Sequence, residues 1–430
     1  MQVIRPADRG YDKLLKKLNR RKVPDPKVRE VVTEVLEAVA REGDEAVIRF
    51  TERFGGSRLD VSQLCVTPAE LGAARSGLPK DVRKAILSAK ANVQAFAKRS
   101  LRKSWFMKNK QGAVVGERFD PFQRVGIYIP GGTAPLVSTA VMTCTLAAAA
   151  GVSEIVAVTP SASDGSVQPA LLGALVECGA TEVYRVGGAQ AVAALAFGTK
   201  TIRSVQKIFG PGNAYVVEAK RQVFGCVAID LLPGPSEILV IADDSANPEW
   251  IAADLLAQSE HGRGSIAILL TDSARVLEAV ATAVSQQGSL SGRPKELALA
   301  LKNTNLVLVG DMEAAVTIAN QFSAEHVAIA TKRPGEIALR LTTAGAIFLG
   351  AISPVVGGDF VAGPSHELPT GGAGKSFAGL TVDQFQRRTS VIMYDEPSLR
   401  ASLPVIETFS RIEGLDAHGR SAAIRVTKAD

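Results

Sequence analysis

The sequence predicts an α/β protein in which two doubly wound parallel sheets are covered by helices. From residue 125 onward, short runs of β-forming residues alternate with segments of helix length. This alternation is typical of parallel strands joined by crossover helices. A Leu-Pro-Gly-Pro break at 232–235 interrupts it, and a length of 430 residues allows two or three domains. Hydrophobic residues make up 46% and charged residues 21% of the chain, so a well-buried globular protein is expected. A single closed barrel is the alternative architecture.

The part of the chain before residue 100 predicts helices only. Asp25-Pro26 combines an N-cap residue with proline at the first helical position, and apolar residues follow at helical spacing up to residue 39. Gly43 ends that helix and Asp44 begins the next one. Thr67-Pro68-Ala69-Glu70 has the spacing of a capping box. No chemistry-bearing pattern is visible here, so we interpret the region as scaffold.

The strands are expected where apolar and β-branched residues cluster between turn residues. We predict strands at 125–129, 154–159, 182–186, 237–242, 266–271, 306–309, 327–330 and 346–349. The tail after residue 379 is predicted to be helical and amphipathic, without strands of its own, and it ends in Glu413 and His418. Such a tail must dock on another surface to be useful.

Composition excludes several classes of partner. The net charge is +6, and the basic runs at 16–22 and 98–110 lack the interleaved aromatic residues that base stacking requires. We interpret them as solvated helix faces and expect no nucleic-acid binding.

No apolar run has the length of a signal peptide or a membrane span. The four cysteines are far apart without a Cys-x-x-Cys pair, which argues against disulfides and thiolate zinc. A cytoplasmic protein is expected.

Three glycine loops follow strands or extended runs and precede helices. They are Pro130-Gly131-Gly132, Gly187-Gly188 and Gly210-Pro211-Gly212-Asn213. In this arrangement backbone N–H groups and a helix N-terminus can hold a phosphate. Each loop alone is more typical of an ordinary tight turn, but three in one half of the chain favour a nucleotide site. Two other glycine motifs, at 262–267 and 369–376, lack the required strand–loop–helix context.

The chain has four histidines, and each lies beside polar residues of the kinds that act in catalysis. Asp359 and His366 lie in segment 358–372, which is too rich in Gly and Pro for helix or strand. Such a loop is a plausible place for chemistry at a cleft, although a solvated surface turn explains the segment equally well. Because imidazole titrates near neutral pH and binds metals, we expect these histidines to be functional.

A metal site is one interpretation of the remaining polar pairs. Gln258 and His261 are three positions apart at the end of a helical run, so their side chains share a face. Asp359 and one further histidine would complete a mixed nitrogen and oxygen set suited to zinc. Glu325-His326 stands separately, just before a strand, as expected of a general-base pair at a sheet edge.

Several segments together resemble the L-histidinol dehydrogenase family. They are 124–132, 210–213, 234–237, 258–261, 325–326, 358–372 and 413–418, and the resemblance extends from about residue 27 into the tail. It implies two incomplete Rossmann-like domains, a helical segment at 1–26 and a helical tail at 381–430. It further implies a homodimer with one Zn²⁺ per subunit that oxidises L-histidinol to L-histidine with two NAD⁺, the last steps of histidine biosynthesis.

The resemblance also assigns roles to residues of this chain. It makes Gln258, His261, Asp359 and His418 the zinc ligands, and Glu325 and His326 the catalytic acid/base pair. Those ligands and His326 would also contact substrate, together with Ser236, His366 and Glu413. Tyr128, Gln190 and Asn213 would contact NAD⁺. The resemblance implies a first Rossmann-like domain that combines 27–128 with 238–380 and a second that spans 129–237. It also implies that the tail crosses to the partner subunit, so the active site would be shared between the two chains.

Departures from the family pattern affect detail more than chemistry. Pro135-Leu136-Val137-Ser138 stands where relatives often carry Tyr-Pro-Ser-Ser, so the shape of the cofactor loop is open.

A related dehydrogenase of another small polyol, such as a sulfonated diol, would share the zinc ligands. An enzyme resembling aldehyde dehydrogenases would need Cys144 as a thiolate. A non-catalytic nucleotide-binding regulator is the alternative of a different class.

Overall fold

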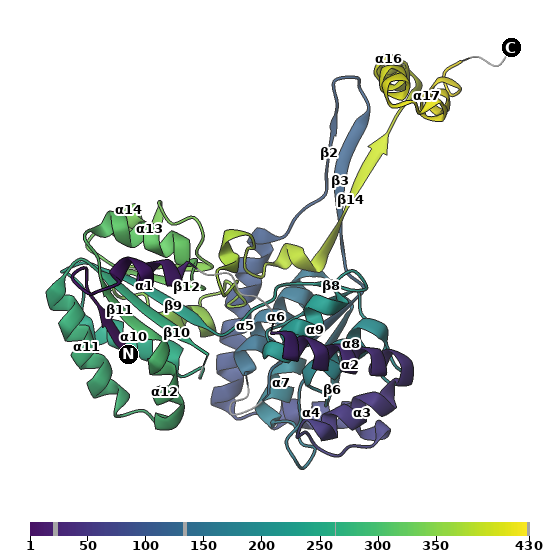
Figure 1. Cartoon of the computed structure of the whole chain (residues 1–430). Helices are drawn as coiled ribbons and strands as arrows, with labels where there is room; N and C mark the ends of the chain where they lie inside the picture. The colour runs from purple at the N-terminus through teal and green to yellow at the C-terminus, as the bar shows by residue number, and fades with distance from the viewer. Residues whose placement is uncertain (20–24, 132–135, 263, 428–430) are drawn as a thin grey trace.

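Two parallel sheets form the body of the molecule, and a long arm projects from it (Figure 1). The computed structural model describes residues 1–19, 25–131, 136–262 and 264–427. Gly132, Pro135 and part of the basic run at 16–22 therefore lie outside the described residues. No described helix is long and apolar enough to span a membrane.

The larger sheet has six parallel strands in the order β1-β11-β10-β9-β12-β13. Its strands are β1 (Gln2–Ile4), β9 (Glu237–Ala242), β10 (Ile266–Thr271), β11 (Thr304–Leu308), β12 (His326–Ala330) and β13 (Ala346–Leu349). Central strand β9 is buried along its whole length, as expected for a parallel strand covered on both faces. Alternate residues of the strands enter two separate apolar cores, one on each face.

The helices of this domain form layers over both faces of the sheet. One core contains side chains of α10 (Pro248–Ser259), α11 (Ala274–Gly288) and α12 (Pro294–Ala300). The other contains side chains of α13 (Met312–Phe322), α14 (Pro334–Ala338) and α1 (Tyr11–Leu18). The short helix α15 (Val355–Phe360) follows β13 and leads into the segment that carries His366.

The smaller sheet has five parallel strands in the order β6-β5-β4-β7-β8. Its strands are β4 (Arg124–Tyr128), β5 (Glu154–Val158), β6 (Glu182–Tyr184), β7 (Lys207–Phe209) and β8 (Ala228–Ile229). One face is covered by α2 (Pro26–Glu42), α3 (Asp44–Arg53), α8 (Gly188–Phe197) and α9 (Ala214–Val223). The other is covered by α4 (Pro68–Ser76), α5 (Lys80–Ser100), α6 (Val137–Ala150) and α7 (Pro169–Cys178).

The expected helix caps are present in this domain. The Asp25 carboxylate accepts a hydrogen bond from the N–H of Lys27 at the start of α2. Thr67 and Glu70 form the predicted capping box at the start of α4. Gly43 ends α2 with a φ of 62°, a conformation that residues with a Cβ rarely adopt. These caps satisfy backbone N–H groups at the helix ends with side chains that are near in sequence.

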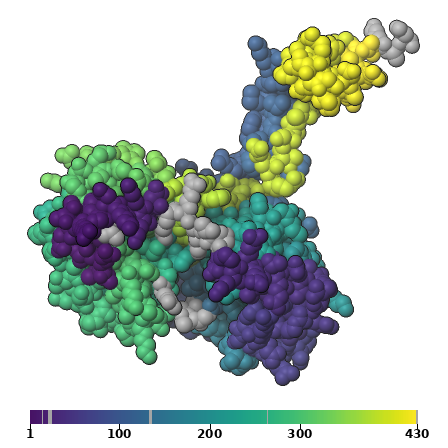
Figure 2. Space-filling model, viewed as in Figure 1, coloured from purple at the N-terminus to yellow at the C-terminus, as the bar shows by residue number. Residues whose placement is uncertain are grey.

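The arm is a three-stranded antiparallel sheet that carries two helices at its tip. Strand β3 (Val114–Pro121) pairs with both β2 (Trp105–Lys108) and β14 (Gln386–Met393). The tip consists of α16 (Glu396–Glu413) and α17 (Asp416–Ala423), which pack against each other. In the view of Figure 2 the tip helices, in yellow, stand clear of both domains. The arm therefore exposes a large surface in the single chain.

The predicted α/β class is confirmed, and all eight predicted strands are present. The break at 232–235 lies between β8 and β9, where the chain passes from one sheet to the other, and neither sheet closes into a barrel. The prediction of a strandless tail is wrong because β14 lies in it. The basic run at 98–110 is helical only up to Ser100, and its remainder leads into β2 instead of forming a solvated helix face.

The grouping of segments into domains also differs from our expectation. We expected residues 27–128 to join 238–380, but β4 pairs with β5 and β7, and α2 to α5 pack on the smaller sheet. Residues 1–26 are not only helical, because β1 adds an edge strand to the larger sheet. Amphipathic periodicity shows that a helix has a buried face, but not which sheet that face covers.

Candidate active site

Glu325 and His326 stand at the amino end of β12 and are almost fully buried. The His326 Nδ1 atom lies 3.0 Å from the carbonyl oxygen of Glu237, the first residue of the neighbouring strand β9. A carbonyl oxygen only accepts hydrogen bonds, so Nδ1 carries the proton in this contact. The other ring nitrogen, Nε2, is then the basic atom of the neutral ring, and it lies 3.5 Å from Asp359 Oδ1.

The carboxyl of Glu325 and the imidazole of His326 both titrate close to neutral pH. Burial raises the pKa of Glu325 to about 8, although its Oε2 accepts a 2.8 Å hydrogen bond from the Glu237 N–H. Burial lowers the pKa of His326, but the Glu325 and Asp359 carboxylates outweigh burial and the net pKa is raised. Because Glu325 Oε2 lies 3.5 Å from His326 Nδ1, the two groups titrate together. The pair can therefore take up and release a proton in the neutral range.

Asp359 and His366 lie close to this pair. Our expectation that 358–372 contains no helix is wrong at its start, because Gly358 to Phe360 form the last turn of α15. The His366 Nδ1 atom lies 2.7 Å from the carbonyl oxygen of Asp359, which fixes the ring orientation. Burial lowers the pKa of His366. Burial raises the pKa of Asp359, but the hydrogen bond and the charge of His326 outweigh burial and the net pKa is lowered, so Asp359 is ionised at neutral pH.

Gln258 and His261 approach the same place from the end of α10. Gln258 is buried in the last turn, whereas His261 lies beyond the helix, after its C-cap Glu260. Their expected shared helix face is therefore replaced by a turn in which the His261 N–H donates to the Gln258 carbonyl oxygen at 3.4 Å. His261 is exposed in the single chain, but partial desolvation still lowers the pKa of its ring, with the nearby Asp359 opposing the shift, so the ring is neutral at neutral pH.

An amide oxygen, a neutral imidazole and an ionised carboxylate form a donor set of the kind that binds zinc. One chain supplies only these three of the four expected ligands. Accordingly, no cluster of three or more His, Cys, Asp or Glu side chains is arranged to hold a metal within the described part of the chain. The donor types fit zinc, and the set is incomplete in a single chain.

Two cavities border these residues. A cavity of about 470 Å³ is lined by His326, Phe348, Gly358, His366 and neighbouring residues of β13 and α15. A second cavity of about 320 Å³ lies where the domains meet, and Asn213, Ser236 and His261 all line it. Both volumes lie in the range of small-molecule sites. The carboxyl ends of the smaller sheet thus face the amino ends of β9 and β10 of the larger one.

The residues expected to contact NAD⁺ lie at the carboxyl end of the smaller sheet. The Tyr128 hydroxyl accepts a hydrogen bond from the Gly188 N–H at 3.0 Å, and Asn213 caps α9 by accepting from two backbone N–H groups. Gln190 is buried, and its Oε1 has no hydrogen-bond partner among the described residues. A side chain on Gly131 or Gly187 would collide with Pro160, so both turns pack closely against this proline and require glycine. An unpaired amide oxygen beside such turns suits a polar ligand.

Glu413 and His418 are not brought to this site within the chain. Glu413 is the last residue of α16, His418 lies in α17, and both are exposed at the tip of the arm. Figure 1 shows the tip far from β12 and α10. If these residues act in the site, a second chain must supply them.

Sequence reasoning missed several buried polar residues near the site. Glu237 is 1% exposed, and its Oε1 accepts a hydrogen bond from the Gly371 N–H at 2.9 Å. Glu237 is the first residue of β9, and the five residues after it are all apolar. An acidic residue in that position was a signal that could have identified it as functional. The side chains of Lys220, Asp230 and Glu367 are also buried. Lys220 and Asp230 gave no signal in the sequence, whereas Glu367 adjoins His366 in segment 358–372 but was assigned no role.

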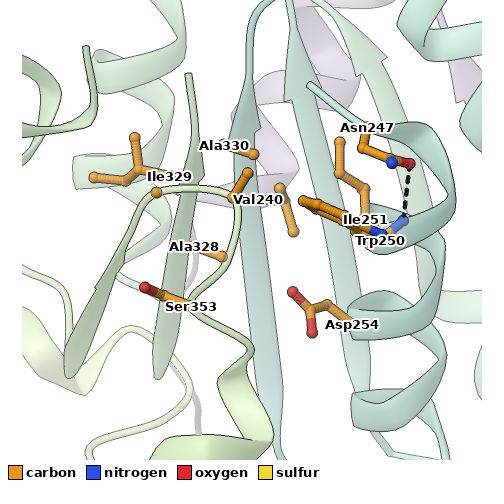
Figure 3. A pocket seen from close by; sticks show the side chains of 11 residues that line it. Val240, Asn247, Trp250, Ile251, Asp254, Ala328, Ile329, Ala330 and Ser353 are labelled. Carbon is orange, nitrogen blue, oxygen red and sulfur yellow. Dashed lines mark hydrogen bonds between the residues drawn. The ribbon is translucent and has the colours of Figure 1, made fainter. Parts of the chain in front are cut away.

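Other candidate features do not support chemistry. The cavity in Figure 3, between α10 and the end of β12, is only about 20 Å³ and has room for one water molecule. Asp254 reaches into it, and burial raises the pKa of this carboxyl to about 6. Cys144 is fully buried in α6, and burial raises the pKa of its thiol strongly. A buried protonated thiol does not serve as a nucleophile, which argues against the Cys144 alternative.

Comparison with known proteins connects this geometry to one family. Residues 18–426 match the family model described as histidinol dehydrogenase. The chain is 43% identical over 403 residues to histidinol dehydrogenase of Geobacillus kaustophilus, covering 94% of this chain and 95% of that protein. It is 44% identical over 402 residues to the protein of the same name from a Synechococcus strain, covering 93% and 92%.

Solved structures agree with the sequence comparison. The crystal structure of histidinol dehydrogenase from Elizabethkingia anophelis has a TM-score of 0.93 and 33% identity, covering 99% of this chain and 98% of that one. An acetylating aldehyde dehydrogenase from Geobacillus thermoglucosidasius has a TM-score of 0.50 at 16% identity, covering 86% and 97%. The second likeness concerns the fold alone.

Proposed function

Because the chain belongs to the histidinol dehydrogenase family, we propose that it oxidises L-histidinol to L-histidine with two NAD⁺, in the last steps of histidine biosynthesis. One observation supports the chemistry most strongly. His326 lines a cavity of about 470 Å³, and its Nδ1 is held by the Glu237 carbonyl oxygen, which leaves Nε2 as the basic atom. A base in this position serves an alcohol oxidation, which requires removal of the hydroxyl proton.

His326 Nε2 accepts the hydroxyl proton of the alcohol in the first oxidation. The Asp359 carboxylate, 3.5 Å away, stabilises the imidazolium that results. Burial excludes water from the ring, so the electrostatic effect of Asp359 is stronger than it is in solvent. The Glu237 carbonyl oxygen keeps the ring oriented throughout.

The second oxidation uses the same pair on the aldehyde. Glu325 and His326 activate a water molecule that adds to the carbonyl carbon, and the pair then takes a hydroxyl proton from the resulting hydrate, whose hydride a second NAD⁺ would accept. Glu325 is suited to this step because burial raises its pKa to about 8, which makes its carboxylate more basic than an exposed one. The same two residues thus serve both oxidations in this proposal.

We propose which residues of this chain would hold zinc and NAD⁺. Gln258, His261 and Asp359 would hold zinc together with His418 of a second chain, and Ser236, His366 and Glu413 would contact substrate. Tyr128, Gln190 and Asn213 would hold NAD⁺ at the carboxyl end of the smaller sheet. Bound zinc would orient the nitrogen atoms of the substrate, and NAD⁺ would accept the hydride.

Removal of zinc is expected to abolish activity reversibly. The ligand set contains no thiolate and is completed only between two chains, so a chelator should extract the metal without unfolding the domains. We expect activity to fall to background after dialysis against a chelator and to return on addition of Zn²⁺, with metal content measured by elemental analysis. Full activity in protein shown to be metal-free would contradict this assignment.

The exposed arm supports the proposal of a homodimer. The strands and tip helices of the arm expose large apolar side chains, among them Trp105, Phe106, Ile392, Phe409 and Ile412. Several large exposed apolar side chains on one projecting element are typical of an interaction site. A second copy related by a two-fold axis would cover the arm and bring His418 and Glu413 to the incomplete site.

Substrate choice is tested by comparing L-histidinol with a sulfonated diol. Purified protein with Zn²⁺ and NAD⁺ should form NADH with histidinol, and its kcat/KM should exceed that for the diol at least about a hundredfold, the discrimination that loss of contacts to the imidazole produces. Turnover of the diol with none of histidinol would assign the protein to the other substrate class. Absence of turnover with both would favour a non-catalytic role.

A further inference from the structure

A buried ion pair lies beneath the loop that leads to Asn213. Lys220 of α9 is fully buried, and the side chain of Asp230, just after β8, is 1% exposed. The Lys220 ammonium contacts Asp230 Oδ1 and donates a 2.7 Å hydrogen bond to the carbonyl oxygen of Gly210. Asp230 Oδ2 accepts a 2.7 Å hydrogen bond from the Gly210 N–H. The ion pair therefore holds both the N–H and the carbonyl oxygen of Gly210.

Gly210 has a conformation that depends on such support. Its φ is 106°, and a Cβ at this position would lie 2.1 Å from the Tyr128 carbonyl oxygen. Only glycine fits, and glycine has the greatest freedom to leave this conformation when nothing holds it. Gly210 opens the turn Gly210-Pro211-Gly212-Asn213, which places the Asn213 cap and the start of α9 beside the cavity between the domains.

An ion pair in the domain interior is an expensive way to stabilise a fold. Two charges must lose their hydration, and well-packed apolar residues of similar volume often stabilise a protein as well or better. Glu367, from the segment that carries His366, is a second buried carboxyl near this pair. Burial and the Asp230 carboxylate raise the pKa of Glu367, so this carboxyl is neutral and Asp230 alone balances Lys220. The two opposite charges thus neutralise each other, and each residue makes one hydrogen bond to the backbone of Gly210.

We propose that Lys220 and Asp230 are positioning residues for NAD⁺: they clamp both backbone groups of Gly210 and so hold the 210–213 turn in the shape that receives the dinucleotide. This inference rests on the proposed function, which places NAD⁺ at Asn213. All contacts of the clamp are made between atoms of the protein, so the clamp can hold the turn in its binding shape independently of the cofactor. Binding then requires less ordering of the loop, which is the effect of preorganisation.

The decisive variant is Lys220→Met, with Lys90→Met as its matched control. Lys90 also donates a hydrogen bond to a backbone carbonyl, that of Glu177, on the opposite face of the smaller sheet. Binding is measured by titration of NADH fluorescence, and mobility of the turn by hydrogen exchange of peptides covering 208–217 in ligand-free protein. Steady-state kinetics with histidinol gives the KM for each substrate separately.

We expect Lys220→Met to weaken NADH binding and to raise the KM for NAD⁺ at least about tenfold, with faster exchange in the turn, because the loop must then be ordered on binding. The KM for histidinol should stay within about threefold, and Lys90→Met should resemble the wild type in every measurement. If Lys220→Met does not fold, Lys220→Met/Asp230→Asn, which leaves no buried charge, is measured against the same criteria.

Wild-type affinity for NADH in a folded variant would overturn the clamp while leaving the proposed function intact. Faster exchange with unchanged affinity would overturn it too, because the pair would then be purely structural. Failure of the wild type to bind NADH would overturn the proposed function, and the inference with it. These outcomes are distinguishable because the wild type is titrated first.

Discussion

Replacement of His326 by asparagine is expected to lower kcat for histidinol oxidation by about 10²–10⁴-fold, the contribution typical of a general base. The asparagine amide can still donate a hydrogen bond to the Glu237 carbonyl oxygen, as His326 Nδ1 does. It offers no basic nitrogen at the position of Nε2. The variant should therefore keep the fold and the metal while losing the proton acceptor.

Thermal unfolding and elemental analysis provide the controls for this variant. An unchanged melting temperature and unchanged zinc content would assign the loss to proton transfer. Retention of more than about a tenth of the wild-type kcat would mean that another group removes the hydroxyl proton, since loss of a general base costs more than that. The mechanism given for His326 would then be wrong.

Two inactive variants are expected to restore activity to each other when mixed. His326→Asn has a defective body and an intact arm, whereas His418→Ala has an intact body and a defective arm. In a dimer that exchanges arms, one of the two sites combines the intact body with the intact arm. Random pairing makes half of the dimers mixed, so co-refolded protein should reach about a quarter of wild-type activity.

The mixing experiment depends on showing that mixed dimers exist. Native mass spectrometry of the two variants, one of them isotopically labelled, gives their fraction directly. Mixed dimers with activity at background would mean that His418 acts within its own chain or not at all. His418 is exposed at the arm tip, far from β12 of its own chain. We therefore expect it to act only in the site of a second chain.

The parts of the fold that the sequence predicted are those with strong local patterns. Strand β9, with the sequence Glu-Ile-Leu-Val-Ile-Ala, is apolar throughout after its first residue, and the caps at Asp25 and Thr67 satisfy helix ends from nearby residues. Strands β7 and β8 have three and two residues, too few to show a period. The arm strand β14 carries Arg387 and Arg388 and is largely exposed, so no apolar alternation revealed it.

The candidate site was predictable in its residues but not in its geometry. The histidines and their acidic neighbours were visible as an unusual set, and the family resemblance gave them roles. The contact between His326 Nδ1 and the Glu237 carbonyl oxygen arises because β9 and β12 are neighbours in register, although 89 positions separate the two residues. Lys220 and Asp230 have the sequence appearance of surface charges, and only the packing of α9 beside β8 shows that they are buried.

The count of NADH formed per histidinol tests the central claim most directly. With limiting L-histidinol, excess NAD⁺ and Zn²⁺, one site that carries both Glu325 and His326 should yield two NADH and one L-histidine for each molecule consumed. Glu325→Gln should slow the aldehyde step more than the alcohol step, because the amide cannot accept a proton from water. Absorbance at the NADH maximum and mass spectrometry of the product give both quantities in one reaction. Two NADH per histidinol is the result that the account predicts, and one NADH with free histidinaldehyde accumulating in the wild type would contradict it.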